Sequence, residues 1–269
     1  MDVSPDCNEL DSGPLAASRT DEAASDTEAA EVRKTTDVLL WSMQLCSLRR
    51  YFHQRFWEEE SREAEYASRI EAIPRLESVA EHCWHVADSV LLIGPSFDLD
   101  LCRCLQLAVL HDKMEITIGD KSPIGRSGTG SSTHAFNEGK RLKKEDLERE
   151  AISAYLAWLP AAARRTQAPI FFELLNGHTN EVHFVRAIDK LQALAFVISK
   201  KKGVMHDKHL KFTLRYSAKA VEYYPALEPY YRELRSRLLK AVAKVRKQTA
   251  LDLELFLDTV QLSLSLDEA

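Results

Sequence analysis

Apolar residues recur at helical spacing in one segment of this sequence after another, and this periodicity most limits the folds open to the chain. From Ser78 onward, Val79, Val86 and Val90 share one helix face with His82, as the 3.6-residue period requires. Alternating runs of β-branched residues are scarce, and only nine glycines and nine prolines are available for turns, which disfavours a β sandwich or barrel. The pattern predicts an all-α fold without internal repeats.

The same periodicity divides the chain into further helices. Gly94 and Pro95 end the first one, and we expect others over residues 101–118, 145–159, 166–175, 181–200, 209–220 and 230–246. A charged, aromatic segment at 51–66 is also expected to be helical, whereas 119–139, with Gly, Ser and Pro throughout, is expected to be a loop. Thr36 is the expected cap of the first ordered helix.

Three regions follow from this pattern. Residues 1–33 have few aromatic residues and many of Ala, Ser, Thr, Asp and Glu, which predicts a disordered acidic tail. Residues 36–247 are expected to form one domain. Residues 248–269 form a leucine-rich C-terminal extension, suited to docking either on the domain or on a partner subunit.

Composition excludes several classes of protein. Lys and Arg number 36 against 41 Asp and Glu, a net charge of −5, so no nucleic-acid partner is expected. No run approaches the ~18 apolar residues of a membrane helix, and no signal or transit peptide is recognisable. Five cysteines without a C-x-x-C pair predict free, largely buried thiols in a reducing, cytoplasmic setting.

Ionisable side chains stand on the apolar faces of three predicted helices. They are His82, then His111 with Asp112 next to it, and finally Asp189. A buried carboxylate is costly unless it is paired or holds a metal. Two histidines and two aspartates suit Mn, Fe, Co, Ni or Zn. Periodicity alone leaves two interpretations open, a metal centre and a set of hydrogen-bonded core residues.

Four motifs in a fixed order narrow this choice. They are Arg75-Leu-Glu-Ser-Val-Ala-Glu-His82, Leu110-His111-Asp112-Lys-Met-Glu115, Gly119-Asp120-Lys-Ser-Pro123 and Ala187-Ile-Asp189-Lys-Leu-Gln-Ala193. This ordered set, over about residues 69–200, resembles the HD-domain metal-dependent phosphohydrolases, most of all the bacterial 5′-deoxynucleotidase branch. A bare His-Asp pair, such as His206-Asp207, carries no such weight. The resemblance implies a compact multi-helix bundle.

The resemblance also implies roles for individual residues. One divalent ion (Mn, Co, Fe, Ni or Zn) is expected on His82, His111, Asp112 and Asp189. Glu115 matches the acid that holds or deprotonates the attacking water, and Asp120 matches an acid beside the substrate. The implied reaction is the hydrolysis of (deoxy)nucleoside 5′-monophosphates to nucleoside and phosphate by a metal-activated water. The related branch forms dimers, so a homodimer is a further expectation.

Substrate contacts are predicted upstream and downstream of these motifs. Arg75 is the candidate phosphate clamp, since a guanidinium donates two parallel hydrogen bonds. If residues 121–144 form a lid, Lys121, Arg126 and His134 bind phosphate; otherwise this segment is a flexible surface loop. The branch has an Arg-Trp pair upstream of its His motif, and Arg69-Ile70 is the nearest match here, which leaves selectivity for deoxyribose open.

Two other functions remain as alternatives. One is an HD phosphohydrolase that acts on another phosphorylated small molecule or on a nucleoside triphosphate. The other is a non-catalytic regulator that binds a nucleotide, an idea that the acidic tail favours. Retention of all four ligand positions and of Glu115 favours turnover.

Overall fold

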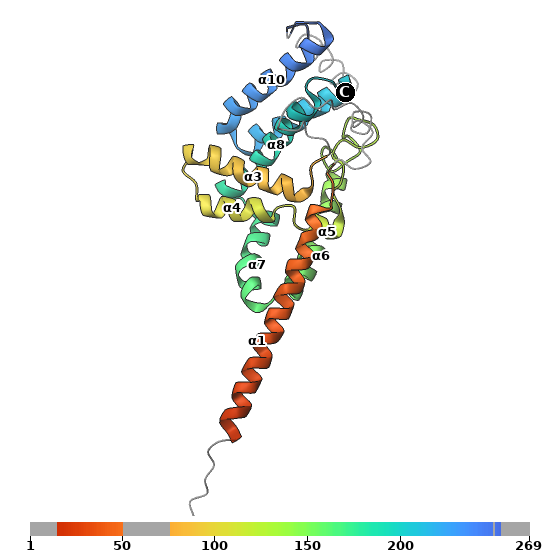
Figure 1. Ribbon diagram of the computed structural model, residues 1–269. Helices are drawn as coiled ribbons and strands as arrows, with labels where there is room; N and C mark the ends of the chain where they lie inside the picture. Colours follow the sequence, from red (N-terminus) through yellow and green to blue (C-terminus); the bar gives the residue numbers. More distant parts are fainter. Residues whose placement is uncertain (1–14, 51–75, 250, 254–269) are drawn as a thin grey trace, which may run out of the picture.

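The computed structural model describes residues 15–50, 76–249 and 251–253, which form helices joined by loops (Figure 1). The elements are α1 (Leu15–Ser42), η1 (Met43–Cys46), α3 (Val79–Ile93), η2 (Gly94–Ser96), α4 (Leu101–Leu110), α5 (Glu115–Ile118), α6 (Glu138–Trp158), α7 (Ala161–Asn176), α8 (Asn180–Lys201), α9 (Asp207–Tyr223), η3 (Pro225–Leu227) and α10 (Glu228–Arg246). Within these ranges there is no strand, only one backbone bridge between Arg49 and Ser78. The prediction of an all-α fold is confirmed.

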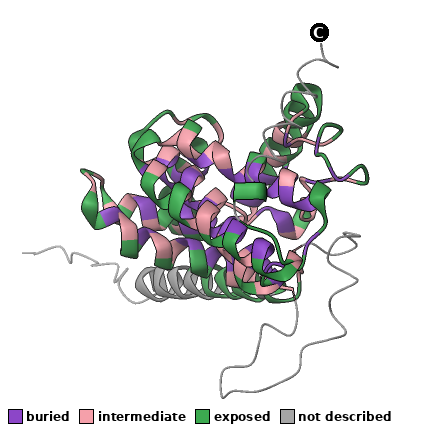
Figure 2. Ribbon diagram, turned by 90° about the horizontal axis from the view of Figure 1, so that it is seen from above, coloured by how far each residue is buried: buried purple, intermediate pink, exposed green. Residues whose placement is uncertain are grey.

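Helix α8 is the centre of the fold, because it packs against α3, α4, α9 and α10. Its N-terminal half contributes Val182, Phe184 and Ile188 to a core shared with α3, α4, α6 and α7. Its C-terminal half contributes Leu194 and Val197 to a second core with α9 and α10. Buried residues lie on the inner sides of these helices, and exposed residues face outward (Figure 2). A helix that is apolar on several faces is stable only inside such a bundle.

Side-chain caps fix where the central helices begin. Ser78 and Glu81 form a capping box at the start of α3, in which Ser78 N donates to Glu81 Oε2 at 2.6 Å and Glu81 N donates to Ser78 Oγ at 3.2 Å. Thr179 caps α8, and Asp100 caps α4. Each cap satisfies amide groups that the first helical turn leaves without partners. Residues 82 and 189 are thereby set at defined positions along α3 and α8.

Several predicted helix boundaries were wrong; helix α7, for example, begins at Ala161 and not at residue 166. The single helix expected over 101–118 breaks after Leu110, and a turn with a hydrogen bond from Lys113 N to Leu110 O (3.2 Å) leads into α5. The apolar spacing hides this break because Met114, the last residue of the turn, is also buried. Helix α6 starts earlier than expected, at Glu138, because Asn137 caps it and Arg141 pairs with Glu138 and Glu145 along its surface.

Helix α1 also begins earlier than the predicted order at Thr36. Residues 15–33 of the expected disordered tail are helical here, and this part of α1 projects away from the other helices (Figure 1). Near the end of α1, Val38 is buried and Trp41 stacks on Tyr155 with ring centroids 5.2 Å apart. Contact with the body thus starts close to the predicted domain boundary. Residues 1–14, the predicted helix at 51–66 and most of the C-terminal extension lie outside the described residues.

The cysteines and the helix lengths bear on two further expectations. The four cysteines in the described ranges are free thiols; Cys83 and Cys104 are buried, whereas Cys46 and Cys102 are exposed, contrary to the expectation of mostly buried thiols. Among the helices described here, none combines the length and the apolar character needed to cross a membrane.

Candidate metal centre

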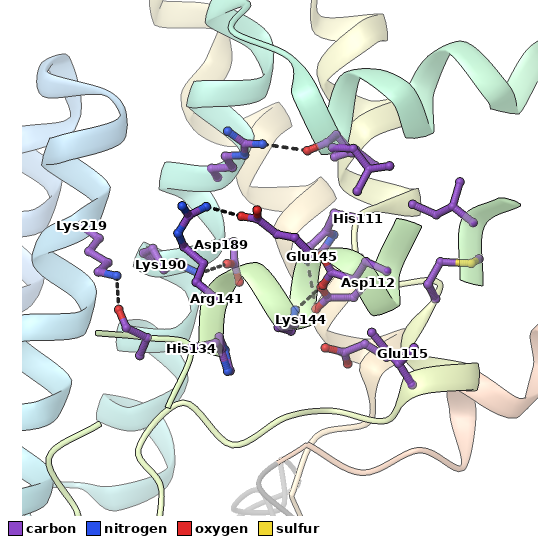
Figure 3. Close-up of a pocket in the computed structure, with 18 of the residues that line it drawn as sticks. His111, Asp112, Glu115, His134, Arg141, Lys144, Glu145, Asp189, Lys190 and Lys219 are labelled. Atoms are coloured by element: carbon purple, nitrogen blue, oxygen red, sulfur yellow. Dashed lines mark hydrogen bonds and ion pairs between the residues drawn. The ribbon is translucent and has the colours of Figure 1, made fainter. Parts of the chain in front are cut away.

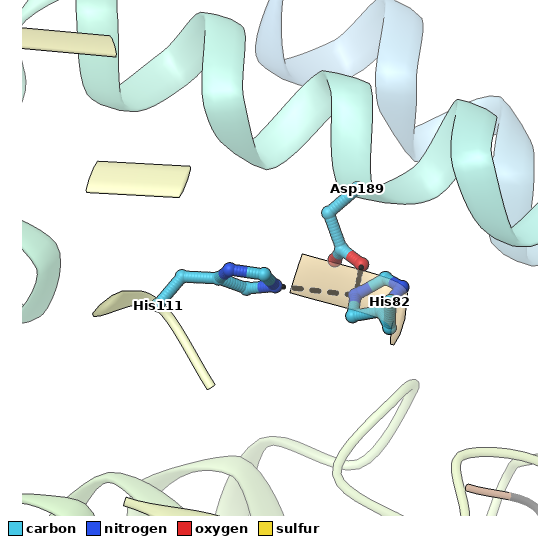
Figure 4. Close-up of side chains that lie close together, drawn as sticks. All are labelled: His82, His111 and Asp189. Atoms are coloured by element: carbon cyan, nitrogen blue, oxygen red, sulfur yellow. Dashed lines mark hydrogen bonds and ion pairs between the residues drawn. The ribbon is translucent and has the colours of Figure 1, made fainter. Parts of the chain in front are cut away.

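Four side chains that are distant in the sequence converge beside α8. His82 comes from α3, His111 from the end of α4, Asp112 from the turn that follows, and Asp189 from α8. His82 Nε2 lies 3.2 Å from His111 Nε2 and 3.1 Å from Asp189 Oδ1 (Figure 4). Asp112 Oδ2 lies 3.5 Å from His82 Nε2 and 3.2 Å from His111 Nε2. The expected metal ligands therefore meet at one point.

The spacing of these donor atoms fits a divalent ion. Two ligand atoms at right angles, each about 2.1 Å from one ion, lie about 3.0 Å apart, close to the distances above. The ligand atoms of His82, His111 and Asp189 all lie within 4.8 Å of one another. Two imidazole nitrogens and two carboxylates suit the metals from Mn to Zn better than Mg or Ca, which prefer oxygen ligands.

The charges around the centre shift the pKa values of its carboxylates in opposite directions. Burial raises the pKa of Asp189, but Lys190 and His82 lower it more, so the net pKa is well below the usual value. Burial likewise opposes ionisation of Asp112, and the charge of His111 outweighs it, so the pKa of Asp112 is also lowered. Glu115 behaves in the opposite way: burial, Asp112 and Asp120 raise its pKa well above the usual value. Carboxylates whose pKa values are pushed apart can divide ligand and proton-transfer roles.

A cavity of about 480 Å³ opens beside this centre (Figure 3). His111, Asp112 and Asp189 form one part of its wall, and Glu115 forms another. His82 is fully buried behind them. The volume lies in the range of small-molecule and cofactor sites, about 300–1,000 Å³.

Cationic side chains form much of the remaining wall. They are Arg141 and Lys144 of α6, Arg186 and Lys190 of α8, and Lys219 of α9. Lys190 Nζ donates to Asp189 Oδ2 at 2.5 Å and to Tyr216 Oη at 2.9 Å, so it stands directly beside the metal centre. The other cations have partners as well: Lys144 pairs with Glu148, and Lys219 donates to the Ala135 carbonyl. The five cations make the cavity suited to an anionic ligand, and Lys190 is the one that contacts a candidate metal ligand.

The substrate residues predicted from the sequence separate into two groups. His134 lines the cavity, and burial next to Lys144, Lys190 and Lys219 lowers its pKa to about 4. Lys121 and Arg126 are exposed and do not line the cavity. Asp120 is half-buried outside the wall and acts on Glu115 through its charge. Arg75 lies outside the described residues.

The predicted lid therefore meets the cavity only in part. His134 and Ala135, near the end of the loop, form wall, as do Arg141 and Lys144, which are in α6 and not in a loop. All five cations of the cavity wall were missed as cavity residues in the sequence analysis. Lys190 follows Asp189 directly in the chain, but this adjacency alone does not predict that its side chain reaches the cavity.

Comparison with known proteins agrees with this architecture. A family model described as an HD domain matches residues 68–228, and the chain belongs to this family. A crystal structure from Magnetospirillum magnetotacticum, titled a predicted metal-dependent phosphohydrolase, superimposes with a TM-score of 0.55 at 19% sequence identity. The match covers 78% of this chain and 94% of that one, which establishes a shared fold.

Two curated relatives are similar in sequence. The 5′-deoxynucleotidase hdd1 of Schizosaccharomyces pombe is 27% identical over 143 residues, which cover 51% of this chain and 65% of that protein. The human 5′-deoxynucleotidase HDDC2 is 27% identical over 122 residues, which cover 45% of this chain and 53% of that protein. The chain thus matches between half and two thirds of the length of these relatives.

Proposed function

We propose that the chain is a metal-dependent phosphohydrolase that converts (deoxy)nucleoside 5′-monophosphates to nucleoside and phosphate. The observation that carries this proposal is the convergence of His82, His111, Asp112 and Asp189 at the wall of a cavity lined by cations. Metal ligands alone would suit many reactions. Ligands that share a cavity with five basic side chains favour a substrate with a phosphate group.

The substrate class rests on two further observations. The relatives named above are 5′-deoxynucleotidases, and they match about half of this chain at 27% identity. The cavity volume is sufficient for one nucleoside monophosphate. Tyr216 and Phe171 in the wall offer apolar surface for a sugar or a base.

The side chains of the site divide the chemistry among them. His82, His111, Asp112 and Asp189 would hold a divalent ion, which would supply Lewis acidity to a phosphoryl oxygen and lower the pKa of water. Glu115 holds its Oε2 buried and without a hydrogen-bond partner among the described residues. We assign to this oxygen the acceptance of the proton from the attacking water. Burial, together with Asp112 and Asp120, raises the pKa of Glu115, which makes its carboxylate a stronger base. Lys190 holds Asp189 and offers positive charge to the phosphoryl group.

Phosphate release from a defined panel tests this function. The full chain is purified without chelator, supplied with Mn²⁺ or Co²⁺, and given ribo- and deoxyribonucleoside monophosphates, triphosphates and sugar phosphates. Metal-dependent release from monophosphates is the expected result, and the ratio of deoxyribo- to ribonucleotide rates measures sugar selectivity. We expect Asp189→Asn to abolish the metal-dependent release of phosphate. Asp98→Asn, a matched change at an exposed site, should leave this release intact.

The other outcomes decide against the proposal. Release from triphosphates or sugar phosphates alone would assign a different phosphohydrolase reaction to the same centre. Metal bound at the centre without release from any compound would favour a nucleotide-binding regulator. Release that is unchanged in Asp189→Asn would show that the centre is not responsible.

A further inference from the structure

Behind the candidate metal centre lies a buried chain of hydrogen bonds that the chemistry above does not use. His82 Nδ1, the ring nitrogen that faces away from the other ligands, lies 2.7 Å from Gln192 Oε1. Gln192 Nε2 in turn lies 3.1 Å from Glu77 Oε2. The three residues are 0%, 7% and 3% exposed, so water does not compete for these bonds. Gln192 stands on α8, one turn after Asp189, and Glu77 directly precedes the cap of α3.

The chemistry of the three groups fixes which atom donates and which accepts in each of these hydrogen bonds. An ionised carboxylate only accepts hydrogen bonds, whereas an amide side chain donates from nitrogen and accepts at oxygen. Glu77 therefore requires the nitrogen of Gln192 to face it, and the oxygen of Gln192 must then face His82. An oxygen in that position requires a proton on His82 Nδ1. With the proton on Nδ1, the nitrogen Nε2 keeps a free lone pair. Nε2 is the atom that faces His111 and Asp189.

A cation supports the charge on Glu77 in the interior. Arg50 Nη1 lies 3.6 Å from Glu77 Oε1, and Arg50 N donates to the Glu77 carbonyl at 3.0 Å. His85, one turn after His82, reaches the edge of the same network, with Nδ1 3.6 Å from Glu77 Oε2. A buried carboxylate with a guanidinium beside it remains ionised and thus remains an acceptor.

We propose that Glu77 and Gln192 are positioning residues that fix the His82 tautomer for metal binding, Glu77 acting through the Gln192 amide. The inference rests on the proposed metal site. If the amide turned around, its nitrogen would donate to Nδ1, the proton would move to Nε2, and His82 could no longer bind an ion with that atom. Glu77 excludes this orientation, because it would set two oxygens against each other.

Metal affinity measures the proposed effect directly. Co²⁺ is titrated into the full metal-free chain and into Glu77→Gln and Gln192→Leu, with absorbance and calorimetry as readouts. We expect affinity to fall about 10- to 100-fold in both variants, the usual range for partners of metal-binding histidines. Glu173→Gln is the control for the first, since Glu173 is a half-buried partner of Arg103 away from the cavity. Gln167→Leu is the control for the second, since Gln167 accepts from Tyr155 at 2.9 Å. Both controls should keep the original affinity.

A double variant distinguishes the action of Glu77 on His82 through Gln192, which we call the relay, from a general loss of packing. If Glu77 acts through Gln192, Glu77→Gln adds no further loss of affinity in the Gln192→Leu background. Equal losses in both backgrounds would overturn the relay. The chain without substitutions supplies a test that needs no variant: ¹⁵N NMR of the Zn²⁺-loaded protein should show a slowly exchanging proton on His82 Nδ1 and metal on Nε2. Metal on Nδ1, or unchanged affinity in both variants, would overturn the proposal.

The same titration distinguishes failure of the relay from failure of the proposed function. Binding of Co²⁺ that neither variant weakens overturns the relay and leaves the metal site standing. A chain that binds no Co²⁺ before any substitution overturns the metal site itself, and the relay with it.

Discussion

Lys190 directly follows Asp189 in the chain, and its Nζ lies 2.5 Å from Asp189 Oδ2. The same ammonium group donates to Tyr216 Oη at 2.9 Å and lies 4.7 Å from the centre of that ring. Three contacts hold one lysine between a metal ligand and the open cavity. An ammonium group has three protons to donate, and two of them are used here, so the third remains for a phosphoryl oxygen.

We therefore expect Lys190→Met to lower kcat/KM for a nucleoside monophosphate by about 10- to 100-fold, since a hydrogen bond to a charged group contributes about 1.5–3 kcal/mol. Lys121→Met is the matched change at an exposed lysine that was predicted from the sequence to bind phosphate. Steady-state kinetics of the two variants compare the prediction from the sequence with the position seen in the structure. A large loss in Lys121→Met together with normal Lys190→Met would contradict our assignment.

Glu115→Gln is expected to keep the metal and lose turnover. Glu115 is buried in the cavity wall and its Oε2 has no partner among the described residues, so the amide fits the same space but cannot accept the proton. Loss of a general base lowers the rate about 10²- to 10⁴-fold. The measurements are metal content by mass spectrometry and kcat with saturating substrate.

Glu145→Gln provides the control for this change, because Glu145 lines the same cavity but is paired with Arg141. It should retain activity within a few-fold. If Glu115→Gln were as active as Glu145→Gln, the role assigned to Glu115 would be wrong.

Periodicity could predict the meeting of His82, His111 and Asp189, because each stands among residues that must face the core. The helix faces that bury Val86, Leu107 and Val185 carry the ligands inward with them. The order of the motifs then favours a metal centre over ordinary core histidines. These features are local in the sequence, so no tertiary information was needed to find them.

The cationic wall of the cavity could not be found in the same way. Arg141 and Lys144 belong to the charged N-terminal half of α6, where no pattern marks which cations face inward. Lys190 is next to Asp189, and adjacent helix residues point about 100° apart; only the long, flexible lysine side chain brings the two together. The relay through Gln192 also depends on how α3 and α8 pack, which sequence spacing does not specify.

We expect the free energy of unfolding to decrease as the pH is lowered, because of a buried histidine remote from the candidate metal centre. His209 on α9 is 3% exposed, and its burial, with Lys201 and His206 nearby, lowers its pKa to about 3. An unfolded histidine takes up its proton near pH 6.5. Between about pH 6.5 and 3, the unfolded state therefore binds one proton more than the folded state, and acid favours unfolding by up to about 1.4 kcal/mol per pH unit.

Urea unfolding from about pH 7 to 4.5 measures this contribution as a slope of the free energy against pH. We expect the slope to be smaller in His209→Gln. His178→Gln, at an exposed position that is not among the groups acting on His209, should retain the slope of the original chain. His134, whose pKa is lowered to about 4, contributes its own part of the slope in every variant. Equal slopes in all three proteins would show that His209 is protonated in the folded state at these pH values.

Two glycines with opposite surroundings give a final test of the packing between α8 and α10. Gly203, two residues after the end of α8, has φ +93°, and a Cβ at this position would lie 2.3 Å from the Ala241 carbonyl oxygen of α10. Gly203→Ala must strain the backbone and separate the two helices, so we expect a loss of at least about 1–3 kcal/mol. Gly139, in the exposed first turn of α6, has no atom closer than 3.6 Å to such a Cβ. Gly139→Ala should stabilise the chain by about 0.4–1 kcal/mol, because it restricts the unfolded state without a clash. Urea unfolding of both variants measures the two shifts, and equal signs would contradict the close approach of α10 to the end of α8.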